Sequence, residues 1–304
     1  MYKHLSTLPT LPMVVIPLIL ILGLFFNPAP LYSQQHPGFE NFQLSKKDEA
    51  EVFFARGLYK ESIEKYKEVL KLEVGTSYIF RTMLKAWKAL NDLKSAEQFF
   101  KDYPKAPSTH TWYADGFLNY LKSDYAVAEA SFSKAVQLDP KNGLAWNNWG
   151  AILSEKKQYP LAVEKVRKAL EANPKEPIFI LNLNKIYSEM GEPHRFEKEY
   201  RDLLQQNSKE LAWAYGKTLA RAIRQRSFGS YSKGDLDNTI AGFEEMLKIY
   251  REIDDIKGEV PALFSLGLLH EEKGNAQKAQ EYFKRVLAIN PNHIQARDKV
   301  KPLD

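Results

Sequence analysis

Serine and lysine stand three residues apart at four places in the sequence, a pairing that can serve nucleophilic catalysis. One class of serine acyl enzymes carries the same S-x-x-K spacing, together with S-D-N and K-T-G strings. Neither of those strings occurs in this chain. We therefore expect no catalytic residue and no enzyme activity at the four pairs, which are Ser62–Lys65, Ser131–Lys134, Ser154–Lys157 and Ser230–Lys233.

The glycines and histidines do not form a cofactor or metal site either. Gly229 and Gly234 have the spacing of a phosphate loop, but Asp235 and Leu236 follow where Lys and Ser or Thr are required. The string SFGSYSKG (227–234) is predicted to be a turn between helices instead. No two histidines have the i, i+4 spacing of a helical metal pair, and His270 is predicted to pack in the core. The histidines are His4, His36, His110, His194, His270 and His293.

Composition limits the partners of the chain. The formal net charge is only +5, and the charged residues alternate along the sequence, so solvated helix faces explain them better than a nucleic-acid site. There is no cysteine. A disulfide and a lipid-modified cysteine are therefore excluded, and the fold must be stabilised by its packed core.

A stretch of 34 residues that spans 143–176 repeats the stretch before it. Six identities at one constant offset indicate a repeat protein. Each unit has apolar residues three and four apart, which predicts two amphipathic helices. The identical pairs are Trp112 and Trp146, Gly116 and Gly150, Tyr125 and Tyr159, Ala128 and Ala162, Ala135 and Ala169, and Pro140 and Pro174.

The residue types explain this period. Gly150 and Ala162 are small, so we expect the two helices of one hairpin to cross closely there. Trp146 and Trp149 are predicted to fill wider gaps, and Pro174 ends the second helix because proline lacks the N–H that a helix needs. A single hairpin cannot cover its apolar face, so the units must stack.

The pattern W-x3-G followed by Y-x2-A-x6-A-x4-P resembles the tetratricopeptide repeat. The resemblance implies an all-α, right-handed superhelical solenoid of antiparallel helix hairpins. We expect about seven units over 45–293, strongest at 109–142, 143–176 and 260–293, with a polar tail at 294–304 that caps the end. The region 177–259 is irregular: Phe196 stands where the repeat has a small alanine, and 207–226 suggests a lengthened helix.

The resemblance also implies a protein or peptide partner, bound along the groove that the first helices line. Asn148 and Asn182 occupy equivalent places in adjacent units, about 10 Å apart by usual helix packing. Each amide can donate and accept, so the pair suits the backbone of an extended peptide. Asn147 and Lys185 are neighbours that can add polar contacts. The alternative is that asparagine at this place only serves the fold.

A second kind of groove in the resembling family holds a terminal carboxylate between lysines, an arginine and asparagines. Tyr113 and Phe117 stand where that clamp would need Lys and Asn. Asn148 and Lys185 alone do not rebuild it, so a carboxylate clamp of this kind is not expected here.

Residues 1–33 lie outside the repeat pattern. Lys3 is the only charged residue among them, and residues 11–26 are almost wholly apolar. This arrangement resembles a secretory signal peptide cut near Ser33–Gln34, or else an uncleaved anchor, followed by a linker at 34–44. Both alternatives place the repeats outside the cytoplasm, in the periplasm of a diderm bacterium.

The sequence thus predicts a non-catalytic, exported scaffold that binds a protein or peptide. Two alternatives remain open at this point. One is an assembly factor attached to the inner membrane through residues 11–26. The other is a regulatory subunit of an envelope or cell-wall enzyme, an alternative that only the predicted location supports.

Overall fold

The computed structural model describes residues 45–103 and 106–300, and within them it confirms an all-α fold of helix hairpins. The described chain has no β-strand. The helices are α2 (Lys46–Ala55), α3 (Tyr59–Val69), α4 (Ser77–Ala89), α5 (Leu93–Asp102), α6 (Thr109–Leu121), α7 (Tyr125–Leu138), α8 (Gly143–Glu155), α9 (Tyr159–Ala172), α10 (Pro177–Glu189), α11 (His194–Gln205), α12 (Lys209–Tyr231), α13 (Leu236–Glu252), α14 (Ile256–Glu272), α15 (Ala276–Ile289) and α16 (Ile294–Lys299).

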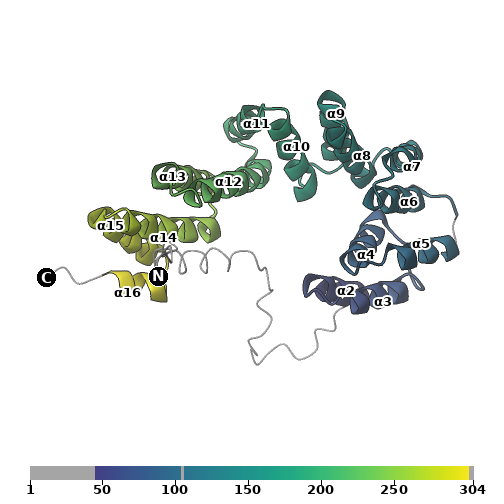
Figure 1. Cartoon of the computed structure of the whole chain (residues 1–304), viewed down its shortest axis with the longest axis horizontal. Helices are drawn as coiled ribbons and strands as arrows, with labels where there is room; N and C mark the ends of the chain where they lie inside the picture. The colour runs from purple at the N-terminus through teal and green to yellow at the C-terminus, as the bar shows by residue number, and fades with distance from the viewer. Residues whose placement is uncertain (1–44, 104–105, 301–304) are drawn as a thin grey trace, which may run out of the picture. The chain divides into compact units, whose positions relative to one another are not determined.

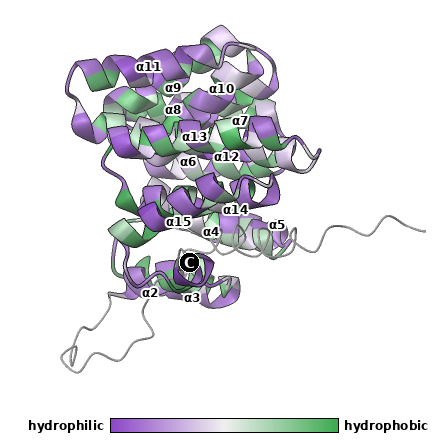
Figure 2. Ribbon diagram, turned by 90° about the vertical axis from the view of Figure 1, so that its left-hand side faces the viewer, coloured by the Kyte–Doolittle hydropathy of each residue, from purple (hydrophilic) through white to green (hydrophobic). Residues whose placement is uncertain are grey.

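The chain divides into two compact bodies, and the division falls within α12. We call the described residues 45–215 the N-terminal body and the described residues 216–300 the C-terminal body. Within each body the helices carry hydrophilic and hydrophobic residues on different sides, as Figure 2 shows by hydropathy. No helix of the described ranges is long and apolar enough to cross a membrane. The predicted signal segment and linker lie outside the described residues.

Short turns of one design join the helices of the N-terminal hairpins. The middle residue of the turn has a left-handed backbone at Asn91, Ser123 and Lys157, with φ values of 56°, 65° and 58°. In two of these turns the next residue caps the second helix. Asp92 accepts from the backbone N–H of Ser95 at 3.2 Å, and Asp124 does the same for Val127 at 3.3 Å. Such a cap satisfies one of the unpaired N–H groups at the helix start.

Small residues allow α8 and α9 to cross closely. A Cβ atom added to Gly150 would lie 2.7 Å from Cγ2 of Val166 and 3.0 Å from the carbonyl oxygen of Ala162. Ala162 itself is fully buried. In the preceding hairpin, Gly116 is equally restricted by the ring of Phe132, at 2.7 Å. The predicted crossing points are therefore confirmed at both glycines.

The two tryptophans of the 143–176 unit lie at the edge of the core. Trp146 and Trp149 are only half-buried, and their rings stack on each other at 5.6 Å. The amine of Lys165 lies 4.7 Å from the Trp149 ring, and that of Lys168 lies 4.7 Å from the Trp146 ring. The rings therefore pack against each other and below lysine side chains at the rim of the hairpin. Both tryptophans are partly buried and pack against the hydrophobic core, in keeping with the prediction that they fill gaps between helices.

The C-terminal body contains longer helices and one correction to the prediction. The predicted turn at 227–234 is wrong for its first part, because α12 continues to Tyr231. Ser227 is buried, and its hydroxyl donates to the carbonyl oxygen of Ile223 at 2.9 Å, which keeps it within the helix. Gly242 makes room for this serine, since a Cβ atom there would lie 2.0 Å from the Ser227 hydroxyl oxygen.

The last hairpin has the packing that the sequence predicted for its histidine. His270 is 3% exposed and its ring stacks on Tyr282 at 5.4 Å. Burial lowers the pKa of His270, so the ring is neutral at pH 7. The polar segment that follows contains the short helix α16, whose Ala296 is fully buried.

Candidate functional site

Four first helices of the N-terminal body follow one another along the inner side of its curve, in the order α4, α6, α8 and α10 (Figure 1). The curve is tight. The hydroxyl of Tyr78, near the start of α4, donates to a carboxylate oxygen of Glu176 at 2.9 Å, although 98 residues separate them in the chain. Burial, followed by this hydrogen bond, raises the pKa of Tyr78 to about 12. Side chains from several helices therefore meet on one face.

Polar side chains on this face form a continuous chain of hydrogen bonds across three helices. The side-chain amide of Asn182 on α10 donates to the side-chain oxygen of Asn147 on α8 at 2.9 Å. Asn147 donates to Asn148 at 3.2 Å, and Asn148 donates to the hydroxyl of Tyr113 on α6 at 3.0 Å. Asn147, Asn148 and Tyr113 are buried, while Asn182 is half-buried. This series of hydrogen bonds joins α6, α8 and α10 to one another.

This arrangement corrects the expected ladder of two separate amides. The amide of Asn148 is 7% exposed and donates to Tyr113 while accepting from Asn147. Asn182 reaches Asn147 and not Asn148, so the equivalent pair of amides is not free to meet a peptide. Removing Asn148 would leave buried polar partners unpaired, which costs stability. Among the three asparagines, Asn182 is the least buried.

Lys185 lies one turn after Asn182 on α10 and is exposed. Its amine lies 3.3 Å from Glu155 and 3.3 Å from Glu189. Partial burial would lower the pKa of Lys185, but the charges of the two glutamates outweigh it and raise the value. The cation is thus balanced within the body, and a ligand would have to compete with two carboxylates for it.

Two other cations on the same face are not neutralised by nearby carboxylates. Arg81 and Lys85 lie one helical turn apart on α4, and no described carboxylate pairs with either. The Nε atom of Arg81 is buried and makes no hydrogen bond. Loss of hydration lowers the pKa of Lys85, and the charge of Arg81 lowers it further. The Lys85 amine lies 5.6 Å from the centre of the Phe54 ring. We call Arg81, Lys85, Tyr113, Asn147, Asn148 and Asn182 the inner-face cluster.

Sequence reasoning missed Arg81, Lys85 and Tyr113 as members of this cluster. A signal was present, because Arg81, Tyr113 and Asn147 each stand four residues after the first residue of their helix. Equivalent positions in stacked helices fall on the same side of the body. The polar residue at this position of α4 is Arg81, so a comparison of equivalent positions in the units identifies it.

The chemical groups of the inner-face cluster suit ligand binding better than catalysis. It contains no nucleophile beside a base, and the described residues include no group of three or more His, Cys, Asp or Glu that could hold a metal ion. A guanidinium that lacks partners near an ammonium group attracts carboxylates, with which arginine forms charge-assisted hydrogen bonds. The half-buried amide of Asn182 stands at the other end of the hydrogen-bonded chain that includes Tyr113.

Comparisons with known proteins agree with this architecture. Residues 260–293 and residues 122–177 match family models of the tetratricopeptide repeat. The first match coincides with the last of the three strong units predicted from sequence. The chain has no match among curated proteins.

Several solved structures are similar to the chain at low identity. The C-terminal part of a TPR repeat-containing protein from Cytophaga hutchinsonii shares 16% identity, with 84% of this chain and 99% of that chain covered and a TM-score of 0.42. YrrB, a TPR protein with an unusual peptide-binding site, shares 20% identity over 67% and 95%, with a TM-score of 0.31. PilW, a type IV pilus biogenesis factor, shares 19% identity over 74% and 98%, with a TM-score of 0.37.

Proposed function

We propose that this chain, which carries tetratricopeptide repeats at 122–177 and 260–293, is a non-catalytic scaffold that binds an acidic protein segment through its inner-face cluster. Proteins of this repeat family act as interaction scaffolds, and helix hairpins occupy most of the described residues. The partner is a protein or peptide and not a nucleic acid. No cofactor takes part in the proposed function.

The single observation that carries the proposal is the unbalanced charge of Arg81 and Lys85. A buried guanidinium N–H without an acceptor costs free energy, and a ligand carboxylate would recover it. Two like charges one turn apart also repel each other, and an anion between them removes that repulsion. The amide of Asn182, at the α10 end of the cluster, can bond a peptide backbone that extends from the bound carboxylate.

The double variant Arg81→Gln, Lys85→Gln tests this site. We expect crosslinked partner recovered from native envelopes to fall about tenfold, which matches the loss of one or two charge-assisted bonds. The melting temperature should not fall, because the variant removes a partly buried charge that has no partner. Recovery is measured by quantitative mass spectrometry after pull-down.

The matched control for this variant is Lys94→Gln, Lys101→Gln on α5, the second helix of the same hairpin. Both lysines are exposed, and the control removes the same net charge away from the inner face. It should recover the partner as well as the wild type does. Equal recovery by the two double variants would contradict the proposed site, and turnover of cell-wall fragments by purified protein would contradict a non-catalytic role.

We further propose that the scaffold is exported and acts in the periplasm. Residues 1–33 support this, since they combine one basic residue with an apolar core and a short Pro- and Ala-containing stretch before Ser33. Mature protein from the native host should begin near Gln34 and appear in the soluble periplasmic fraction. Intact-mass measurement decides the point. A membrane-bound species that retains Met1 would favour the alternative, an assembly factor anchored at residues 11–26.

A further inference from the structure

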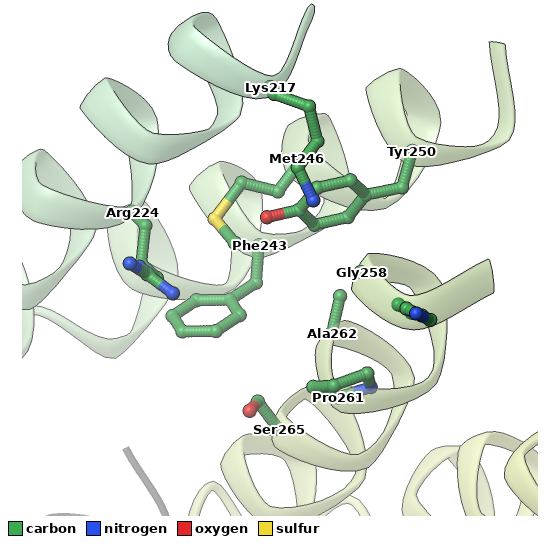
Figure 3. Close-up of a pocket in the computed structure, with 10 residues that line it drawn as sticks. Lys217, Arg224, Phe243, Met246, Tyr250, Gly258, Pro261, Ala262 and Ser265 are labelled. Atoms are coloured by element: carbon green, nitrogen blue, oxygen red, sulfur yellow. The ribbon is translucent and has the colours of Figure 1, made fainter. Parts of the chain in front are cut away.

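The C-terminal body contains a cavity of about 210 Å³ among α12, α13 and α14 (Figure 3). These three helices have 23, 17 and 17 residues, whereas α6 to α9 have 13 or 14. The cavity therefore lies where the repeat departs from its regular length. Two of the three helices, α12 and α13, belong to the irregular region 177–259.

Apolar side chains form the walls of the cavity. Phe243 and Met246 from α13 face Pro261 and Ala262 from α14 across it (Figure 3). Phe243, Met246 and Ala262 are all at least 97% buried, so their positions are fixed by packing. A preformed apolar wall of this kind favours an apolar side chain over water.

The charged side chains at the cavity are mostly cationic. Lys217 and Arg224 stand seven residues apart on α12, which places them on the same side of that helix, and Lys257 comes from α14. The amine of Lys217 lies 2.6 Å from the buried carboxylate of Asp255. The residues that line the cavity thus include three cationic side chains and no acidic one, which suits an anionic group.

The backbone of α14 and the hydroxyl of Tyr250 add hydrogen-bonding groups to the site. Pro261 lies inside α14 and has no N–H, so the carbonyl of Lys257 does not receive its usual helical hydrogen bond and can accept one from a ligand. Gly258 permits the Tyr250 ring to lie against α14, because a Cβ atom there would come within 2.5 Å of the ring. Burial raises the pKa of Tyr250, so its hydroxyl keeps its proton and can donate.

We propose that this cavity binds a peptide segment in which an apolar side chain adjoins an aspartate or glutamate. The apolar side chain lies between Phe243 and Pro261, and the carboxylate meets the cations of α12 and α14. The volume is below the roughly 300 Å³ of small-molecule sites, which fits one side chain and excludes a whole cofactor. The cavity lies wholly within the C-terminal body. Its binding role and the binding role of the inner-face cluster can therefore be tested, and rejected, independently of each other.

The test uses the full chain and three short probes, followed through the amide resonances of α12 to α14. The probes are acetyl-Asp-Phe-amide, acetyl-Asn-Phe-amide and acetyl-Asp-Ala-amide. We expect saturable shifts of these resonances with the first probe. Dissociation constants should be about tenfold higher for the second, which lacks the charge, and for the third, which lacks the ring.

Two charge reversals on neighbouring helices complete the experiment. Lys257→Glu places a negative charge at the cavity and should raise the dissociation constant of acetyl-Asp-Phe-amide about tenfold. Lys248→Glu makes the same change at an exposed position of α13 that does not line the cavity, and should leave it unchanged. Equal binding of the Asp and Asn probes, or competition by inorganic phosphate as strong as by the peptide, would overturn the proposal.

Discussion

Replacing Phe196 by alanine is expected to lower the free energy of unfolding by about 3–5 kcal/mol. The repeat pattern alone leads to the opposite expectation, because alanine is the usual residue at this place. In the structure Phe196 is fully buried on α11, and its ring stacks on Tyr215 with the two ring centres 4.9 Å apart. Alanine would leave a cavity between α11 and α12 and expose the Tyr215 ring to it.

Urea unfolding measures this loss, and amide hydrogen exchange shows where it acts. Exchange should accelerate in α11, while amides of α4 and α6 stay protected, because each hairpin of a repeat array contacts mainly its neighbours. The control is Leu161→Ala on α9, whose side chain is 48% exposed and should cost no more than about 0.5 kcal/mol. A stable Phe196→Ala variant would show that α11 packs in another register.

The variant Ala162→Leu is expected to destabilise the chain by roughly 1–3 kcal/mol, since overpacking a tight crossing forces backbone shifts. Ala162 has no exposed surface, and Gly150 on the facing helix has no room for even one added atom. The larger side chain must therefore push α8 and α9 apart. The free energy of unfolding in urea gives the magnitude.

The same substitution at an exposed site separates packing from helix propensity. Ala130 lies on α7, in the hairpin before, and faces solvent. Ala130→Leu should stay within about 0.5 kcal/mol of the wild type, because alanine and leucine are both good helix formers. Similar losses at Ala130 and Ala162 would mean that the crossing of α8 and α9 is not where the structure has it.

The repeat period predicted the fold class from local rules. Gly116, Gly150 and Ala162 are small because two helices of one hairpin touch there, and that contact depends only on residues close in sequence. The same is true of the burial of His270, which follows from the register of the last unit. Local geometry repeats with the period, so the sequence could predict these positions without any knowledge of the curvature.

Other features depend on the specific neighbours of a side chain and were predicted less completely. The sequence predicted that Trp146 and Trp149 fill gaps between helices, but not that their rings stack on each other below the lysines of α9. It placed a turn at 227–234 because glycine and serine gather there, but Ser227 bonds back to Ile223 and α12 continues. In both cases the outcome involves specific neighbours that the residue types alone do not identify.

By itself the sequence determined an all-α array of helix hairpins and the places where its helices cross. Only the tertiary structure decided the candidate sites. It turned the expected pair of amides, Asn148 and Asn182, into one chain of bonds with Tyr113, and it left Arg81 without a partner. It also opened a cavity among the lengthened helices. The physical reason is that these groups are distant in sequence and meet only through the curvature and packing of stacked hairpins, which no single repeat encodes.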